Sequence, residues 1–553
     1  MQADVVIVGS GAAGLTAAIL AARSGLSVLV LESTSVIGGT SAIAGGGIWI
    51  PNNHLAAATG VEDSKAMAEA YLRAVLGNRY DAAKIDAFLE NAPDMLRYVQ
   101  DATDAKFMPV AVGDYVLGMP GWTAGRTLIP CPYDGNRLGS LLKKLRSPIP
   151  EMGLFSAMQV TFLDLGILRH WNRSASNFIG TASLLARYAW DKLRHGKGAR
   201  LGNGNALVAG LLRSAIDSGV EIWTDAPAQE LIKDQGRVTG VVCFRENRRE
   251  IIIVSRAVIL ATGGCGANPE MRRRYIPDTI SDLSLQPEGC TGGGLTMGEA
   301  AGGRIEHDNE DNGIWVPVSV SQRKDGSIAK LPSLILERHC PGSIMVDAAT
   351  GRRFVNEGLS YQHFGRTAIK HDIRKAYILS DAPAVRKYGL GMVKPAPFSV
   401  RPWVEKGYVI EGDTVSDLAS KIGLDASILN KTIADFNRHA VNGEDPEFQR
   451  GQDSISAGAG DPEHKPNPAL GPLKTGPFYA LPIVPGDLSI FAGLETDAHA
   501  RVTDRTGNPI PGLYAVGLDS NSLFRGCYPG AGASIGPAMT FAYIAARDIA
   551  AAA

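Results

Sequence analysis

The 553-residue sequence is poor in cysteine, with six residues and no Cys-x-x-Cys pair among them. A zinc site or a redox dithiol needs closely spaced ligands, so the scattered cysteines predict reduced, mostly buried thiols and no metal site. The sequence also lacks an apolar run of about 18 residues, the length from which a membrane-spanning helix is inferred. Its first apolar strand begins near Val5, which leaves no room for a signal peptide, and we expect a cytoplasmic protein.

A dominant charge of either sign is lacking too. The 55 lysines and arginines balance 56 acidic residues, giving a net charge of -1. A chain so close to neutral gives no electrostatic reason to expect a nucleic-acid partner. Its length exceeds what one hydrophobic core normally supports, so two domains or one large composite are expected.

A glycine cluster near the N-terminus is the most informative feature that is present. An apolar run at residues 5–8 leads directly into Gly9-Ser10-Gly11-Ala12-Ala13-Gly14, and an Ala/Leu-rich helix is predicted after it. The next apolar run ends at Glu32, which Ser33 follows. A strand, a glycine turn and a helix N-terminus together bind a pyrophosphate, and a carboxylate about 20 residues further on holds a ribose hydroxyl. The pattern therefore predicts a bound dinucleotide.

Later glycine-rich segments favour FAD over NAD. A second cluster follows the acidic residue and contains Gly39, Thr40, Ser41, Gly45, Gly46 and Gly47. A flavin needs such backbone because its long ribityl chain runs along the protein surface, whereas a simple NAD site does not. Two further apolar strands end in small residues, at Ala261-Thr262-Gly263 and at Gly517. Near the C-terminus, Ser534 and Ile535 stand at the start of a predicted helix, whose free N–H groups suit a flavin carbonyl.

Together these motifs resemble the glutathione-reductase-like FAD fold and, within it, the fumarate reductase and succinate dehydrogenase flavoprotein superfamily. The resemblance implies an α/β fold, in which a Rossmann FAD-binding domain carries an inserted α+β substrate domain. We assign residues 1–282 and 474–553 to the FAD-binding domain and residues 283–473 to the insertion. Covalent members carry a histidine beside the second glycine cluster, where this sequence reads Thr40-Ser41-Ala42, so we expect FAD to bind without a covalent bond.

The spacing of apolar residues places the regular elements. It predicts helices over residues 64–79, 83–100, 204–218, 414–422 and 426–440, and a closing helix from near Gly536. Strands are predicted at residues 220–223, 237–243 and 250–254, because β-branched residues dominate there.

A basic and hydrophobic segment interrupts the first domain. Between residues 143 and 200 there are ten basic residues and only three acidic ones, with aromatic and leucine side chains interleaved. Basic residues beside tryptophan and leucine on a helix suit a segment that lies on an anionic membrane surface. The same pattern suits a helical excursion that packs on its own domain or on a second subunit. Both interpretations stay open, so peripheral membrane contact is one expectation for this segment.

Candidate catalytic residues lie in two segments far from the N-terminus. Tyr528 precedes a turn that contains Gly530 and Gly532, where a hydroxyl and uncovered backbone N–H groups come together. Such donors stabilise an oxyanion. In the middle of the chain, Tyr361 and His363 are both candidate bases, and histidine has the more suitable unperturbed pKa. Desaturation beside a ketone needs a base, an oxyanion site and a flavin N5 that accepts hydride.

At residues 45–53, 354–357, 485–488 and 528–532 the sequence resembles 3-ketosteroid Δ1-dehydrogenases, and the likeness covers nearly the whole chain. In that family a tyrosine at the place of Tyr361 takes the proton from C2. A second tyrosine, which Tyr115 matches, donates a hydrogen bond to this base and eases its ionisation. The resemblance also implies that the Tyr528 hydroxyl and the Gly532 N–H hold the 3-keto oxygen. Three departures concern the shape of the pocket: Ala531 replaces a proline, Val116 replaces an aromatic residue, and Thr291–Gly294 lacks the family's acidic residue.

The resemblance implies FAD-dependent desaturation of the C1–C2 bond of a 3-oxosteroid, with an external quinone-type electron acceptor. Three other activities stay open. A smaller cyclic ketone of the cyclohexanone type suits the same four residues, and a Δ4-(5α)-ketosteroid dehydrogenase would act on a different bond. A fumarate-reductase-like enzyme would need arginines for two carboxylates, for which Arg525 or Arg366 are candidates. A flavin-binding partner without catalysis is the remaining alternative.

Overall fold

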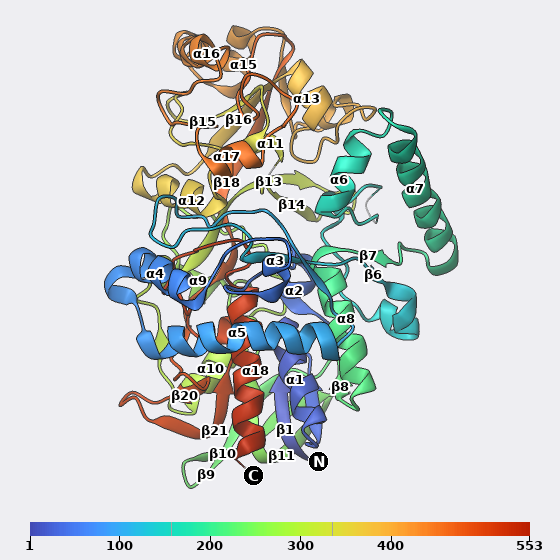
Figure 1. The fold of residues 1–553 in the computed structure, drawn as a ribbon, viewed down its shortest axis with the longest axis vertical. Coiled ribbons are helices and arrows are strands. Elements are labelled where there is room, and N and C mark those ends of the chain that lie inside the picture. The colour runs from blue at the N-terminus through green and yellow to red at the C-terminus, as the bar shows by residue number, and fades with distance from the viewer. Residues whose placement is uncertain (156–157, 335, 553) are drawn as a thin grey trace. The chain divides into compact units, whose positions relative to one another are not determined.

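The computed structural model describes residues 1–155, 158–334 and 336–552 (Figure 1). The chain forms two units, one of residues Met1–Tyr275, Gln286–Asn312 and Ile490–Ala553, and the other of residues Ile276–Leu285 and Gly313–Ser489. Sequence reasoning placed the return to the first domain at residue 474, whereas the structure places it at residue 490. The reason is that β18 (Phe478–Ile490) pairs with β16 (Ala376–Asp381) of the second unit.

A parallel sheet forms the centre of the first unit. Its parallel strands lie in the order β21 (Pro509–Ala515), β11 (Arg248–Leu260), β1 (Gln2–Val8), β2 (Val28–Leu31) and β8 (Glu221–Trp223). The middle of β1 is wholly buried, as expected for a parallel strand covered on both faces. This strand order agrees with the predicted Rossmann arrangement, because β1 lies between β2, which follows the first glycine motif, and β11, which leads into Ala261-Thr262-Gly263.

Four helices pack around this sheet. They are α1 (Ala12–Arg23), α5 (Ala82–Ala102), α8 (Asn203–Asp217) and α18 (Ile535–Ala551). Helix α1 packs against α18 and α8, and α5 crosses α18, as Figure 1 shows. The predicted helices at 83–100, 204–218 and near Gly536 are thereby confirmed, with ends that differ by a few residues. The helix predicted at 64–79 is α4 (Lys65–Leu76), which begins after the N-cap Ser64.

Smaller elements surround the parallel sheet. Strands β9 (Ala228–Asp234) and β10 (Arg237–Arg245) form an antiparallel extension of β11. Strand β3 (Ile48–Trp49) pairs with β5 (Thr127–Pro130), and β5 pairs with β4 (Phe107–Pro109). The basic and hydrophobic segment contains α6 (Phe162–Arg169) and α7 (Ala175–His195). Among the described residues, no helix is long and apolar enough to span a bilayer.

The second unit is an α+β structure. Its sheet has the order β14 (Ile328–Pro332), β13 (Gly313–Gln322), β18, β16 and β15 (Ser343–Asp347), and β17 (Ile410–Gly412) also pairs with β18. Helices α15 (Val415–Ile422) and α16 (Ala426–Ala440) lie where the sequence predicts them, and their apolar faces close a core with β15 and β16. Helix α12 (Tyr361–Lys370) packs against β13.

Candidate active site and cofactor cradle

The N-terminal glycine turn is closed by contacts that only glycine allows. Gly9 has a φ of +117°, and a Cβ at this residue would lie 2.1 Å from the carbonyl oxygen of Ala261 at the end of β11. A Cβ at Gly14 would lie 2.1 Å from the oxygen of Gly9. At Gly11, by contrast, a Cβ would meet only the hydroxyl of Ser41, at 3.5 Å. The first and third glycines therefore hold the strand, turn and helix together, and the second leaves an open side.

The acidic residue of the motif lies beside this turn. The Ser10 hydroxyl donates to Oε2 of Glu32 at 2.5 Å, and the backbone N–H of Thr34 donates to Oε1 at 2.9 Å. Both carboxylate oxygens are thus fixed, and the side chain is buried. Ser33, the neighbouring candidate, is exposed.

Most of the other cofactor candidates have a surface that is open or partly open among buried neighbours. This holds for Gly39, Thr40, Ser41, Gly45, Gly47, Thr262, Gly263, Gly517, Ser534 and Ile535, whereas Ala12, Ala13, Gly46 and Ala261 are buried. A Cβ at Gly39 or Gly45 would meet no described atom within 4 Å. The Ala12 N–H donates to the Ser41 hydroxyl at 3.1 Å, which ties the two glycine clusters together. These residues fit FAD, since they form a cradle of uncovered backbone that larger side chains would fill.

Asp519, two residues after Gly517, anchors the cradle and was not among the predicted residues. It is wholly buried and accepts hydrogen bonds from the backbone N–H and the hydroxyl of Thr262, at 2.5 and 2.8 Å, and from the N–H of Gly264 at 3.1 Å. Burial raises the pKa of this carboxyl. A Cβ at Gly294, in α10 (Gly293–Ala300), would lie 2.3 Å from Asp519 Oδ2. The only sequence signal for this role of Asp519 was its position two residues after Gly517.

Arg146 is a second residue that sequence reasoning missed. Its Nη2 donates to the Thr34 hydroxyl at 3.0 Å, and its Nη1 donates to Glu288 at 3.4 Å. Its buried Nε has no acceptor among the described residues. The guanidinium thus adds a cation beside the turn that holds Glu32. Arg146 was missed because it lies in the basic segment of residues 143–200, which was interpreted as a membrane-contacting or packing segment.

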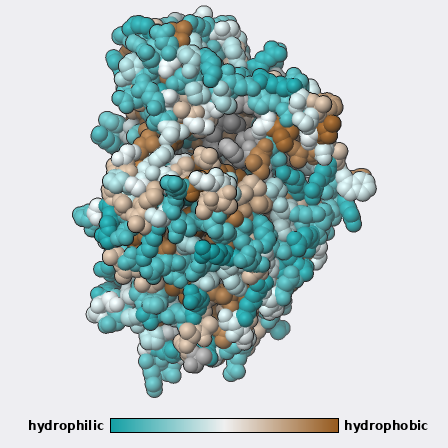
Figure 2. Space-filling view, in the orientation of Figure 1, coloured by the Kyte–Doolittle hydropathy of each residue, from teal (hydrophilic) through white to brown (hydrophobic). Residues whose placement is uncertain are grey.

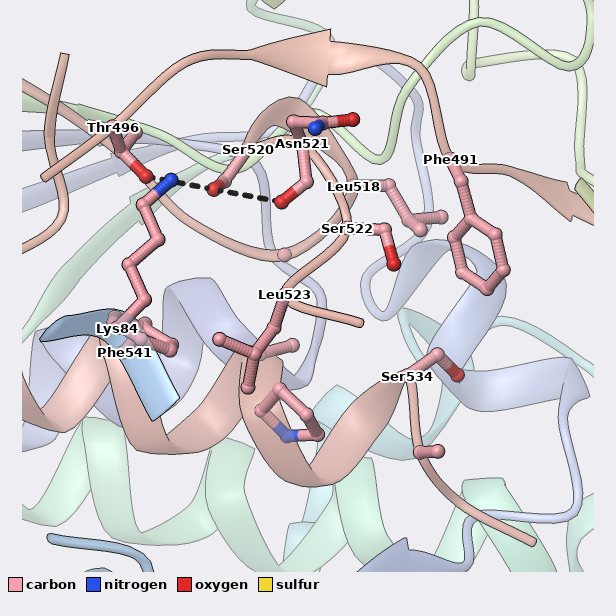
Figure 3. A pocket seen from close by; sticks show the side chains of 14 residues that line it. Lys84, Phe491, Thr496, Leu518, Ser520, Asn521, Ser522, Leu523, Ser534 and Phe541 are labelled. Carbon is pink, nitrogen blue, oxygen red and sulfur yellow. Dashed lines mark hydrogen bonds between the residues drawn. The ribbon is translucent and has the colours of Figure 1, made fainter. Parts of the chain in front are cut away.

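A hollow adjoins two cofactor candidates of the first unit. Figure 3 shows its lining, to which the loop after Gly517 and the start of α18 at Ser534 both contribute. The Thr496 and Ser520 hydroxyls are 3.1 Å apart on one side of it. Lys84 reaches the hollow from α5, and its Nζ donates to Glu495 at 2.9 Å. The hollow therefore lies beside both Gly517 and the N-terminus of α18.

Two of the three predicted tyrosines come together in the first unit. The rings of Tyr115 and Tyr528 have centroids 5.9 Å apart and are inclined at 46°. The Tyr115 N–H donates to the carbonyl of Pro529 at 2.7 Å, and the Tyr71 hydroxyl donates to the same oxygen at 2.8 Å. Tyr71 and Tyr115 are thus hydrogen-bonded to Pro529, although more than 400 positions separate each of them from it in the sequence.

A buried ion cluster supports the turn at Tyr115. Arg126 donates from Nη1 to Asp114 and from Nη2 to Asp63, both at 2.6 Å. Asp114 also accepts from Nε1 of Trp49 at 2.8 Å. Burial raises the pKa of Asp114 to about 6, although the charge of Arg126 acts in the opposite direction. The residue before Tyr115 is thus fixed to two other elements.

Gly532 is held against β3. It has a φ of +90°, and a Cβ there would lie 2.7 Å from backbone atoms of Gly47 and Ile48. Its carbonyl accepts from the Trp49 N–H at 3.1 Å. Its own N–H donates to no acceptor in the part of the chain that the structure describes. A backbone donor therefore stands in the same loop as the Tyr528 hydroxyl.

Tyr361 belongs to the second unit, where it is the first residue of α12. The helix begins after Ser360, whose hydroxyl accepts from the His363 N–H at 3.2 Å. The segment before it is anchored by Arg353, which donates to both oxygens of Glu357 at 3.1 and 2.9 Å. Tyr361 is partly buried, whereas the rival base His363 is exposed.

Known proteins match this chain along almost its whole length. The model of the FAD binding domain family matches residues 4–535. A 4-oxocyclohex-2-ene-1-carboxylate 5-dehydrogenase from Sinomonas cyclohexanicum is 39% identical, with 99% of this chain and 93% of that protein covered. A 3-oxosteroid 1-dehydrogenase from Mycolicibacterium smegmatis is 35% identical, with coverage of 99% and 97%. The crystal structure of 3-ketosteroid Δ1-dehydrogenase from Sterolibacterium denitrificans, in complex with 1,4-androstadiene-3,17-dione, superposes with a TM-score of 0.92 at 33% identity over all of both chains.

Proposed function

This chain belongs to the FAD binding domain family, and from that premise we propose that it desaturates the C1–C2 bond of a 3-oxosteroid. The observation that carries the proposal is the pairing of Tyr115 with Tyr528, which belongs to the same loop as Gly532 in the first unit. We propose that the Tyr528 hydroxyl and the Gly532 N–H converge on a ketone oxygen on which negative charge develops. The likeness to steroid dehydrogenases supports the choice of ring system.

The protein's share of the reaction is to acidify, remove and hold a proton. The Tyr528 hydroxyl and the Gly532 N–H donate to the 3-keto oxygen, and each such donor contributes about 3 kcal/mol to stabilisation of the enolate-like transition state. Polarisation of the carbonyl acidifies the hydrogens on C2. Tyr361 accepts the C2 proton, with Tyr115 assisting its ionisation, while the C–H electron pair moves toward C1 to form the new double bond.

The cofactor's share is redox chemistry. The chemistry that FAD would supply is acceptance of the hydride from C1, which together with the proton taken by Tyr361 would account for the two hydrogens lost. Gly9, Gly11, Gly14 and Glu32 would hold its ADP half, and the segments at Gly45–Gly47, Thr262, Gly517 and Ser534 would hold its flavin half. Desaturation removes two electrons from the substrate, so an external acceptor is required, and we propose that it is a quinone.

A second candidate substrate is a 4-oxocyclohexane- or cyclohexenecarboxylate. Two Sinomonas cyclohexanicum enzymes named for such substrates are 39% and 36% identical to this chain. The same proton and hydride chemistry suits these ketones. A fumarate-reductase-like activity has less support, because both terminal nitrogens of Arg525 donate to Glu495, at 3.3 and 3.2 Å.

A substrate panel tests the proposal. Purified holoenzyme is assayed with a soluble dye acceptor against 4-androstene-3,17-dione, 5α-androstanedione, 4-oxocyclohexanecarboxylate and cyclohexanone, and with a reduced dye as electron donor against fumarate. We expect turnover of the first, with formation of the 1,4-diene. Turnover confined to 4-oxocyclohexanecarboxylate would assign the second candidate, and turnover of fumarate alone would overturn the tyrosine mechanism.

Tyrosine variants test the assignment of residues. Tyr361→Phe is expected to abolish turnover, and Tyr528→Phe is expected to lower kcat about 10²- to 10³-fold, as for loss of one oxyanion donor. Both should retain FAD, as measured by visible absorbance. Tyr543→Phe, a change on α18 away from the paired tyrosines, serves as the matched control. Wild-type kcat in Tyr361→Phe would show that another group is the base.

A further inference from the structure

Helix α7 turns its apolar face to solvent. Leu193 is 83% exposed, and Ile179, Trp190 and Phe178 are 65%, 64% and 55% exposed. Apart from Ala175 in its first turn, the exposed apolar residues of this helix are Phe178, Ile179, Ala182, Leu185, Ala186, Ala189, Trp190 and Leu193. A helix of a soluble protein normally buries such a face.

The exposed set forms one continuous stripe. Residues 178, 182, 185, 189 and 193 follow the three- and four-residue spacing of a single helix face, and residues 179, 186 and 190 lie directly beside them. The opposite side is turned inward, with Tyr188 and Leu184 partly buried and Asp191 buried. Helix α7 is therefore amphipathic, but its apolar face points to solvent, whereas a helix that packs on a core buries its apolar face.

The stripe extends beyond α7. Trp171 is exposed and its ring lies 6.4 Å from that of Phe178. Leu163 of α6 and Phe155 are exposed as well, and Phe155 stacks on Tyr188 with centroids 6.3 Å apart. Figure 2 shows hydrophobic side chains gathered where Figure 1 draws α6 and α7.

The charges around the stripe are of one sign. Arg173, Arg187, Lys192 and Arg194 are exposed on α7 or in the turn before it. The single acidic residue of the helix, Asp191, is buried, and its carboxylate accepts from the Ala199 and Arg200 N–H groups at 2.9 and 3.2 Å. Arg187 pairs with Asp134 at 3.1 Å, and the exposed cations Lys192 and Arg194 stand beside the apolar stripe.

From this arrangement we infer that α7 lies on the surface of an anionic lipid bilayer. Its apolar stripe enters the boundary between headgroups and acyl chains, and the cations along its edges bind lipid phosphates. A second copy of the chain fits less well, because a symmetric contact through this stripe would bring the same basic edges together. The stripe lies along one exposed helix, which can lie parallel to the plane of a membrane.

Co-sedimentation with vesicles tests this inference. The holoenzyme is mixed with vesicles of equal parts phosphatidylglycerol and phosphatidylcholine, and in parallel with vesicles of phosphatidylcholine alone. We expect binding to the first that weakens as salt is raised. The double change Ile179→Glu/Leu193→Glu should lower it more than tenfold, and Lys192→Glu/Arg194→Glu should lower it by about 25-fold, or about fivefold for each cation removed.

Controls keep the result interpretable. Ile328→Glu and Val441→Glu replace exposed apolar residues elsewhere and should leave vesicle binding unchanged. All variants should keep wild-type Tm and wild-type turnover with a soluble dye, because α7 lies outside the proposed catalytic residues. Equal sedimentation of wild type and Ile179→Glu/Leu193→Glu would overturn the inference. A dimer in vesicle-free sedimentation that the same double change dissociates would instead assign the stripe to a second copy.

Discussion

Replacing Gly14 by alanine tests why the fingerprint glycines are present. A Cβ at Gly14 would lie 2.1 Å from the Gly9 oxygen, whereas ordinary contact begins at 3.4 Å, so the start of α1 must move by about 1.3 Å. The neighbour is backbone and has no rotamer to change. Overpacking in a dense core costs about 1–3 kcal/mol, and a backbone obstacle puts this site at the upper end.

The expected readouts follow from that magnitude. If about 3 kcal/mol must be supplied each time the cradle adopts its binding geometry, FAD affinity falls by more than about a hundredfold. Gly14→Ala should also lower the Tm of the apoprotein, because the clash exists without cofactor. Both quantities are measured on protein stripped of FAD, by flavin fluorescence titration and by thermal unfolding.

Gly11→Ala is the matched control within the same motif. Its φ of -70° is ordinary, and a Cβ there would meet only the Ser41 hydroxyl at 3.5 Å. The apoprotein Tm should therefore be unchanged, whereas FAD affinity should still fall because the added methyl occupies the open side of the turn. Wild-type Tm and wild-type FAD affinity in Gly14→Ala would refute the reasoning.

Three further predictions concern buried polar groups. Folding raises the pKa of Asp114 from 3.8 to about 6, so the folded protein binds this proton more tightly than the unfolded chain does. The contribution of this carboxyl to the free energy of unfolding therefore decreases by about 3 kcal/mol as pH rises from about 4 to 6. Asp114→Asn should remove that dependence in urea titrations across this range, and an unchanged slope would contradict it. Asp519→Asn should cost about 1–3 kcal/mol and release FAD, because an amide cannot replace a carboxylate that accepts three donors; retention of FAD with wild-type Tm would argue against an anchoring role. Glu32→Gln should weaken FAD binding in fluorescence titrations, whereas Glu90→Gln, which breaks an exposed ion pair with Lys65, should change stability by less than about 1 kcal/mol.

Local patterns in the sequence predicted the cofactor fold well. The run from Val5 to Gly14 forms the expected strand, turn and helix, because each step depends on neighbours within a few residues. Family membership and FAD are confirmed by the match over residues 4–535. Tyr528 and Tyr361 were candidates from their own segments, whereas Tyr115 was found through resemblance alone. The resemblance supplied the roles of all three tyrosines, and these roles remain predictions.

Long-range pairings set the limit of sequence reasoning. Asp519 and Thr262 are 257 positions apart, and no local pattern pairs them. The boundary at residue 490 depends on β18 pairing with β16, which strand propensity does not reveal. The sequence left two interpretations of α7 open, because helical periodicity shows that a face is apolar but not which way it points.

The path of the chain between its two units has a consequence for protein engineering. The backbone passes from one unit to the other at four places, near residues 275, 285, 312 and 489. Neither unit can therefore be removed by shortening the chain from one end, and no single recombination point exchanges one unit between relatives intact. A chimera that takes its second unit from a homologue needs matched junctions at all four places. The second unit is thus encoded by two separate pieces of sequence, and random single-crossover recombination would divide them.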